Sequence, residues 1–222
     1  MSERVVRASL SREAIVAAAI TLADAEGLDA VSVRRLAQLH GVTPMALYRY
    51  FRDKDELLGG LAEALVAEVR LPPGSGPWRD QLRTLLQGVL APLRAHPTIA
   101  ELVPTRFLDS PAGLAVAERT LAILRRAGLP LDTAAELSGS LLSGLVGMVV
   151  VEPGRHHGSD AEERDDAIRA RMASLIALPP RNYPNVVDAA PSLAACASPD
   201  AYYRIGVEML VNGVAGVVRS RH

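Results

Sequence analysis

The feature that most restricts the fold of this chain is the stretch from residue 32 to residue 54, which places two short helical patterns around one glycine. Apolar residues recur at helical spacing over residues 32–40, and Ser32 can cap this first segment. The second segment, residues 43–51, opens with Thr-Pro, a capping residue followed by proline at the first helical position. Gly41, between the two segments, suits a turn with a left-handed backbone. This pattern predicts a helix-turn-helix, whose second helix can enter a major groove.

Helical spacing also dominates the rest of the chain, whereas the alternating pattern and Asn-Gly turns of β-hairpins are scarce. Ser11 and Asp53 can cap the first and fourth helices. We expect helices over residues 11–26, 32–40, 43–51, 54–70, 78–95, 98–104, 110–127, 131–152, 161–177 and 199–219, and a long loop over 178–198. The predicted fold class is therefore all-α.

The clearest interruption of the helical pattern is Leu-Pro-Pro-Gly-Ser-Gly-Pro at residues 71–77, because proline and glycine both break helices. We place a domain boundary there. Residues 1–54 are predicted to form a three-helix, helix-turn-helix DNA-binding domain, followed by a linking helix over 54–70. Residues 71–222 are predicted to form a C-terminal helical domain, and the 49% apolar content of the chain is ample for its core.

The charge of the chain is informative only locally. A net charge of −1 gives no overall basic surplus, but between residues 34 and 54 the basic side chains face a single acid, Asp53. A bound phosphate interacts mainly with nearby charges, because salt screens charges beyond about 10 Å. Arg34 and Lys54 open predicted helices, where the helix dipole also favours a phosphate.

We call the second helical segment of the helix-turn-helix motif, residues 43–51, the recognition segment. Its side chains have chemistry suited to DNA. Arg49 can bind guanine, and Met45 and Ala46 can contact thymine methyl groups. Tyr48 and Tyr50 can donate to phosphates, whereas Val42 and Leu47 are expected to face inward. The predicted DNA-contacting residues are Arg34, Thr43, Pro44, Met45, Ala46, Tyr48, Arg49, Tyr50 and Lys54.

Residues 11–62 resemble the DNA-binding domain of the tetracycline-repressor (TetR) family of transcriptional regulators. The matching positions are Ser32, Arg34, Leu36-Ala37, Gly41-Val42, Leu47-Tyr48, Tyr50-Phe51, Asp53-Lys54 and Leu57-Leu58. The resemblance implies a homodimeric repressor that binds a palindromic, double-stranded operator. It also implies that the C-terminal domain serves for ligand binding and dimerisation. When a small-molecule effector binds in this domain, the protein is expected to release the operator.

The C-terminal part is similar to the tetracycline-repressor subgroup itself. The cues are Pro77-Trp78, His96-Pro97, residues 126–129, Gly206 and Gly213. In that subgroup polar side chains and a histidine-bound magnesium ion hold the drug. Leu85 and Val89 occupy the polar positions here, Val103-Pro104 lies where the histidine is expected, and Glu152 matches a carboxylate near the metal. We therefore expect no metal or other cofactor, and a largely apolar effector.

The predicted effector-binding residues are Leu85, Val89, Leu102, Arg106, Phe107, Leu142, Leu145 and Val149. Most of the apolar members are equally expected as ordinary core residues, and Arg106 could be either an anion anchor or a solvated side chain. Metal-ligand residue types also occur together at Glu152, His156, His157 and Asp160. They lack the helical spacing that would preorganise them, so we expect no metal site there.

Two predicted helices, over 131–152 and 199–219, carry many small residues. These residues are Ser138, Gly139, Ser140, Ser143, Gly144, Gly147, Gly206, Gly213 and Gly216. Such faces either allow close packing within one chain or pair across a two-fold axis as a four-helix interface, which is how the resembled family dimerises. Two-fold pairing also suits a palindromic operator, so we expect a dimer.

Other classes of protein are less well supported. A single cysteine, Cys196, fits a reducing compartment, and the charged N-terminal segment lacks the apolar core of a secretory signal. The apolar stretch over 137–151 is shorter than a bilayer requires, so we expect a buried helix of a cytoplasmic protein without membrane contact. No Gly-x-Ser-x-Gly, phosphate loop, His-Glu-x-x-His or Cys-x-x-Cys suggests an enzyme. The remaining alternatives are an activator or a ligand-binding module without induction.

Overall fold

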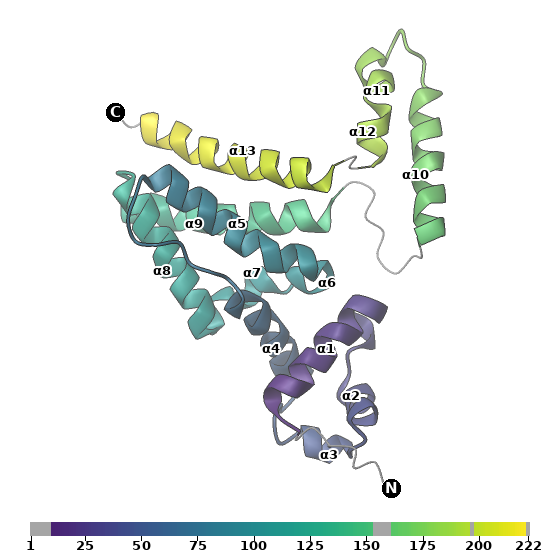
Figure 1. The fold of residues 1–222 in the computed structure, drawn as a ribbon, viewed down its shortest axis with the longest axis vertical. Coiled ribbons are helices and arrows are strands. Elements are labelled where there is room, and N and C mark those ends of the chain that lie inside the picture. The colour runs from purple at the N-terminus through teal and green to yellow at the C-terminus, as the bar shows by residue number, and fades with distance from the viewer. Residues whose placement is uncertain (1–9, 153–160, 196–197, 221–222) are drawn as a thin grey trace, which may run out of the picture.

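A computed structural model describes residues 10–152, 161–195 and 198–220 of the 222-residue chain. All regular secondary structure in these residues is helical, which confirms the predicted all-α fold. Figure 1 shows a small lower part that contains the N-terminal helices, a larger upper body, and a helical arm that projects from the body. Helix α4 runs from the lower part into the body and contacts helices of both.

The lower part follows the predicted helix-turn-helix pattern. It contains α1 (Arg12–Glu26), the 3₁₀ turn η1 (Leu28–Ala30), α2 (Val33–His40), α3 (Pro44–Leu47) and the start of α4 (Lys54–Ala67). The expected caps are present: the side chains of Ser11, Ser32 and Asp53 accept hydrogen bonds from backbone N–H groups in the first turns of α1, α2 and α4. Local sequence therefore sets where these three helices begin.

The body is a bundle of long helices joined by short ones. It contains α5 (Trp78–Ala95), α6 (Pro97–Ala100), α7 (Val103–Arg106), the 3₁₀ turn η2 (Phe107–Asp109), α8 (Pro111–Arg126), α9 (Leu131–Val150) and α13 (Pro199–Arg219). Helix α5 packs against α8, α9 and α13, so it lies at the centre of the bundle. Its leucine and valine side chains form a continuous buried core with those of its neighbours.

The arm consists of α10 (Ala161–Ile176), α11 (Pro184–Asp188) and α12 (Ala190–Ala194), and α10 packs against both short helices. The prediction of a loop over 178–198 is therefore wrong. The loop prediction rests on the prolines of this segment, but Pro184 and Pro191 lie in the first turns of α11 and α12. Proline is tolerated there, since the first N–H groups of a helix have no partner within the helix.

Three predicted helices are shorter or more broken than expected. The helix predicted over 98–104 is split into α6 and α7, because Pro104 has no N–H to continue the ladder of hydrogen bonds. Helix α4 ends at Ala67, and the next residues form tighter i to i−3 bonds. Helix α3 ends at Leu47 rather than at Phe51, and a hydrogen-bonded turn follows it.

The segment between α4 and α5 is fixed to the body by side-chain hydrogen bonds. The guanidinium of Arg126, at the end of α8, donates to the carbonyl of Gly74 over 2.7 Å. The Gln81 amide donates to the carbonyl of Gly76, also over 2.7 Å. The Pro- and Gly-rich sequence thus breaks the helix, but the resulting loop lies against α8 in a defined position.

Within the described part of the chain, α9 is the one helix that is long and apolar enough to cross a bilayer. Here it is a helix of the bundle, in contact with α5, α6, α7, α8 and α13. The predicted burial is confirmed on one side only. Ala134, Leu141, Leu145, Val146 and Val149 are buried, whereas the opposite side of the helix is exposed in the single chain.

Candidate functional site

The turn between α2 and α3 has the geometry that the sequence predicts. Gly41 adopts φ 64° and ψ 33°, in the left-handed region that favours glycine. The Val42 N–H donates to the Ala37 carbonyl over 3.0 Å, which closes the end of α2. Leu47 is buried and Val42 packs, half-buried, against the core, so both face inward as expected. This packing fixes how α3 lies on the lower part.

The outer surface of α3 and the turn that follows carries exposed side chains. Met45 is 74% exposed and Tyr48 is 49% exposed, so both large side chains are accessible on this surface. Thr43, Pro44 and Arg49 are also exposed. Although Thr43 occupies the N-cap position, its side chain makes no capping hydrogen bond, so the hydroxyl is not used by the helix.

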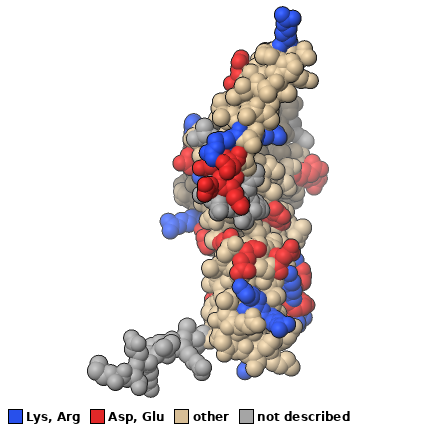
Figure 2. All heavy atoms as spheres, turned by 90° about the vertical axis from the view of Figure 1, so that its right-hand side faces the viewer, with Lys and Arg blue, Asp and Glu red and all other residues tan. Residues whose placement is uncertain are grey.

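The basic residues near this surface fall into two groups. Arg35 pairs with Glu26 at 3.0 Å and Arg52 pairs with Glu56 at 3.1 Å. Arg34, Arg49 and Lys54 are exposed and form no ion pair with any residue that the structure describes. In Figure 2 the lower end of the molecule is mostly uncharged, with a group of basic side chains on the face above it.

The turn before α4 is held by a local ion pair. The backbone N–H and the guanidinium of Arg52 both donate to the Glu56 carboxylate, at 2.9 and 3.1 Å. The backbone hydrogen bond is the main reason why the pKa of Glu56 lies below its ordinary value, with the guanidinium bond second. Together with the Asp53 cap, this contact fixes the first turn of α4, from which Lys54 projects.

Tyr50 does not face outward as predicted. It is half-buried and packs against the core, and its hydroxyl donates to the Leu10 carbonyl over 2.7 Å. The prediction failed because the partner lies forty residues earlier in the chain. Ala46 is also half-buried rather than fully exposed. Tyr50 therefore anchors the segment before α1.

A small cavity lies between α5, η2, α8 and α9. Its lining residues are Leu85, Leu86, Val89, Phe107, Val116, Thr120, Ser138, Leu141, Leu142 and Leu145. Its volume is about 20 Å³, roughly the space of one water molecule. The Thr120 hydroxyl is used, since it donates to the Val116 carbonyl over 2.8 Å. Ser138 is thus the lining residue whose hydroxyl has no hydrogen-bond partner in the described chain.

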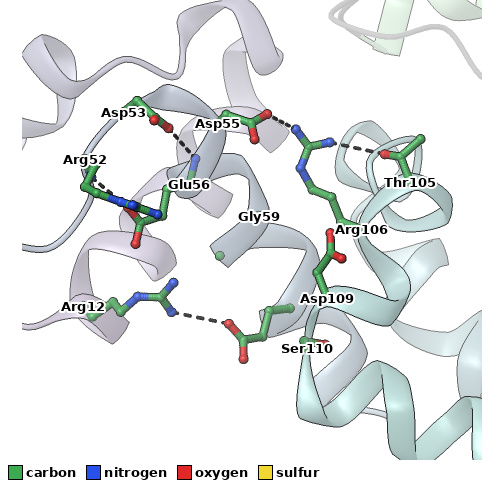
Figure 3. A pocket seen from close by; sticks show the side chains of 12 residues that line it. Arg12, Arg52, Asp53, Asp55, Glu56, Gly59, Thr105, Arg106, Asp109 and Ser110 are labelled. Carbon is green, nitrogen blue, oxygen red and sulfur yellow. Dashed lines mark hydrogen bonds and ion pairs between the residues drawn. The ribbon is translucent and has the colours of Figure 1, made fainter.

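Five of the residues predicted to bind an effector line this cavity: Leu85, Val89, Phe107, Leu142 and Leu145. The other three do not line it. Val149 is a fully buried core residue, and Leu102 packs half-buried against the core. Arg106 is not among the lining residues, and its guanidinium forms an ion pair with Asp55 on α4 (Figure 3). Sequence spacing placed these residues near one another but could not give their directions.

Among the described residues, two polar bridges join the lower part to the segment that runs from His96 to Arg106, and the sequence predicts neither. The Arg106 guanidinium of α7 pairs with the Asp55 carboxylate of α4. His96, between α5 and α6, has its Nδ1 2.7 Å from a carboxylate oxygen of Asp24 at the end of α1. These partners are 51 and 72 residues apart, so no local pattern announces them. Figure 3 shows the first bridge within a polar groove of about 630 Å³.

The residues with metal-ligand chemistry do not assemble in the described chain. Glu152 accepts a hydrogen bond from the Tyr203 hydroxyl over 3.1 Å. His156, His157 and Asp160 lie outside the described residues. No group of three or more histidine, cysteine or carboxylate side chains is placed to hold a metal ion in the part of the chain that is described.

An exposed helix-turn-helix surface, whose cations have no ion pair within the described residues, joined by α4 to a helical bundle, is typical of a DNA-binding transcriptional regulator. Two family models match the chain: "Bacterial regulatory proteins, tetR family" over residues 15–61, and "Tetracyclin repressor-like, C-terminal domain" over residues 72–218. The chain therefore belongs to the TetR family, which confirms the resemblance stated from the sequence. This is a family of transcriptional regulators and not of enzymes.

Relatives support this assignment along most of the chain. An HTH-type transcriptional regulator of Saccharopolyspora erythraea is 33% identical over 173 residues, which cover 76% of this chain and 73% of the relative. The class A tetracycline repressor from transposon 1721 of Escherichia coli is 29% identical over 210 residues, or 93% and 91% of the two chains. The structure of the Streptomyces coelicolor TetR family protein ActR in complex with actinorhodin is similar, with a TM-score of 0.77 and 28% identity. It covers 95% of this chain and 99% of ActR.

Proposed function

We propose that this protein is a cytoplasmic repressor that binds a palindromic operator as a homodimer and leaves it when a small, largely apolar effector binds. The observation that carries the proposal is the exposed surface of α3, from Thr43 to Arg49, beside cations that have no partner within the described chain. The exposed Met45 side chain and the Arg49 guanidinium, which has no ion pair within the described chain, are free to contact a DNA groove from this surface.

The contacts to DNA follow from the chemistry of this surface. Arg49 binds guanine acceptors, while Met45 and Ala46 contact the methyl groups of thymine. Thr43 offers a hydroxyl that its helix does not use, and Pro44 lies beside it at the helix start. The remaining predicted contacts are to phosphates and come from Arg34, Tyr48 and Lys54. Tyr50 is not among them, since its hydroxyl is bonded to Leu10.

The effector site that we propose is the cavity between α5, α8 and α9. Its lining is almost entirely aliphatic or aromatic, which favours an apolar ligand, and the Ser138 hydroxyl offers one polar anchor. At about 20 Å³ the cavity is closed to any organic effector, so binding requires the lining helices to separate. ActR, solved with actinorhodin bound, supports the idea that this fold accommodates a small molecule.

The homodimer that we propose pairs the exposed sides of α9 and α13. A side chain at Gly144 would contact Leu210, and one at Gly206 would overlap with Met148, so these two glycines serve packing within one chain. By contrast, Gly139, Gly147, Gly213 and Gly216 have open space around them. Small residues that meet nothing within the chain are available for close contact with a second copy.

Selection of bound duplexes from a random DNA pool by the purified protein tests this proposal. We expect a palindromic consensus whose half-sites are centred about 34–36 Å apart, one turn of DNA, because a two-fold dimer presents two copies of α3. Transcription from a promoter that carries the consensus should fall when the protein is added, whereas an activator would raise it. A monomeric protein that selects no sequence at low salt would refute the proposal.

A further inference from the structure

Arg106 connects the wall of the apolar cavity to the start of α4. Its neighbour in the chain, Phe107, lines the cavity. Its own guanidinium pairs with Asp55 in the first turn of α4, next to Lys54. Displacement of Phe107 therefore moves the backbone that carries Arg106. Because the Arg106 guanidinium is paired with Asp55, this movement either shifts the start of α4 or breaks the ion pair.

A second carboxylate lies within reach of the same guanidinium. Asp109 follows Arg106 by three residues and lines the same polar groove (Figure 3). In the described part of the chain its carboxylate has no ion pair or hydrogen bond. The groove is open to water and has a volume of about 630 Å³, so there is space for the Arg106 side chain to turn.

The existing bridge is weak enough to be exchanged. The side chain of Arg106 is 20% exposed, but that of Asp55 is 82% exposed, so water screens the pair strongly. A guanidinium that leaves Asp55 for Asp109 gives up one screened carboxylate and gains another. The two arrangements are therefore close in free energy, which is what a switch between two conformations requires.

We propose that Arg106 is a switch residue, which pairs with Asp55 in the DNA-binding conformation and with Asp109 when an effector opens the cavity. The proposal rests on the effector-responsive DNA binding proposed above. The other bridge, between His96 and Asp24, involves no cavity residue, so the proposed switch leaves it intact. Loss of the Asp55 contact then allows the start of α4, and the recognition segment before it, to shift relative to the body.

Two neutral variants separate this switch from simple electrostatics. Asp55→Asn and Asp109→Asn each remove one negative charge from the same groove. If charge alone mattered, both variants would bind DNA more tightly. The switch predicts opposite outcomes: Asp55→Asn weakens binding to the selected duplex by about 1.5- to 5-fold, the range of an exposed ion pair, whereas Asp109→Asn binds as tightly as the parent or more tightly.

The arginine itself completes the test. Arg106→Gln should weaken binding as much as Asp55→Asn does, and the double variant should be no weaker than either single one, because both remove the same contact. Asp166→Asn is the matched control, since it breaks the exposed Arg169–Asp166 pair on α10, away from the groove and from the helices proposed to dimerise. Its affinity for the duplex should equal that of the parent.

Amide hydrogen exchange in the first turn of α4, measured without DNA, keeps this test independent of the operator. Arg106→Gln and Asp55→Asn should both exchange faster there than the parent, and Asp109→Asn should not. A parent protein that selects no duplex refutes the proposed function, whatever the exchange shows. Selection of a duplex combined with equal affinities of Asp55→Asn and Asp109→Asn, or unchanged exchange in Arg106→Gln, refutes the switch alone.

Discussion

Replacement of Lys54 by alanine tests the DNA-binding surface most directly. Lys54 opens α4, is exposed and has no ion-pair partner among the residues described. Its whole charge is therefore available to a phosphate. We expect Lys54→Ala to weaken binding to every duplex by about the same factor, because a phosphate contact carries no base preference.

The size of this effect follows from counterion release. One lost phosphate contact makes the slope of log K against log salt shallower by about 0.9, and two protomers on two half-sites double this to about 1.8. Between about 50 and 200 mM salt the parent would then lose about 12-fold more affinity than the variant. Fluorescence anisotropy with a labelled duplex at four salt concentrations measures both slopes.

The control is Arg181→Ala, which removes a positive charge from an exposed residue between α10 and α11. Its salt slope should match that of the parent, since it lies on the arm and far along the chain from the recognition surface. A slope that Lys54→Ala leaves unchanged would refute the phosphate contact. Equal changes in both variants would mean that net charge, rather than the position of Lys54, determines the slope.

Three further outcomes are expected. Arg49→Ala should cost about 1–3 kcal/mol of DNA binding and broaden the selected consensus at one position per half-site; an unchanged consensus would show that Arg49 contacts no base. Gly113→Ala should lower the free energy of unfolding by about 1–3 kcal/mol in denaturant titrations, because its Cβ would lie 1.6 Å from the Phe107 carbonyl oxygen; an unchanged midpoint would contradict this packing. Glu208, whose pKa the Arg83 hydrogen bond holds below its ordinary value, should contribute stability at neutral pH that is lost as the pH falls through its lowered pKa. Glu208→Gln should therefore unfold with a flatter acid dependence than the parent, and parallel curves would exclude this contribution.

The parts of the fold that the sequence predicts correctly depend on neighbours within one or two turns. The Ser32 hydroxyl and the Asp53 carboxylate each accept from an N–H three residues later, so capping residues alone mark these helix starts. Gly41 is equally local, because the left-handed backbone at that turn is a property of one residue. These three positions define the helix-turn-helix, which is why its existence could be predicted from a single sequence.

What the sequence did not predict depends on partners distant in the chain. Tyr50 lies on a segment whose pattern favours exposure, yet its hydroxyl bonds to Leu10. Arg106 is expected from the sequence to be either an anion anchor or a solvated side chain, but its guanidinium forms an ion pair with Asp55 of α4. Both outcomes depend on how the helices pack against one another. Helical spacing predicts which face of a helix a residue occupies, but not which residues of another helix contact that face.

The small cavity and the polar groove together determine how an effector could act. A drug-sized ligand needs a pocket of about 300–1,000 Å³, far more than the 20 Å³ between α5, α8 and α9. In the proposed mechanism an effector binds a conformation in which the lining elements, η2 with Phe107 among them, have moved apart, and part of its binding free energy is spent on that movement. Because Arg106 precedes Phe107, the same movement disturbs the bridge to α4. The proposed coupling is reciprocal: if DNA favours the intact bridge, it weakens effector binding by the factor by which the effector weakens DNA binding. In the proposed mechanism the small cavity supplies the difference in effector affinity between the two conformations that release of the operator requires.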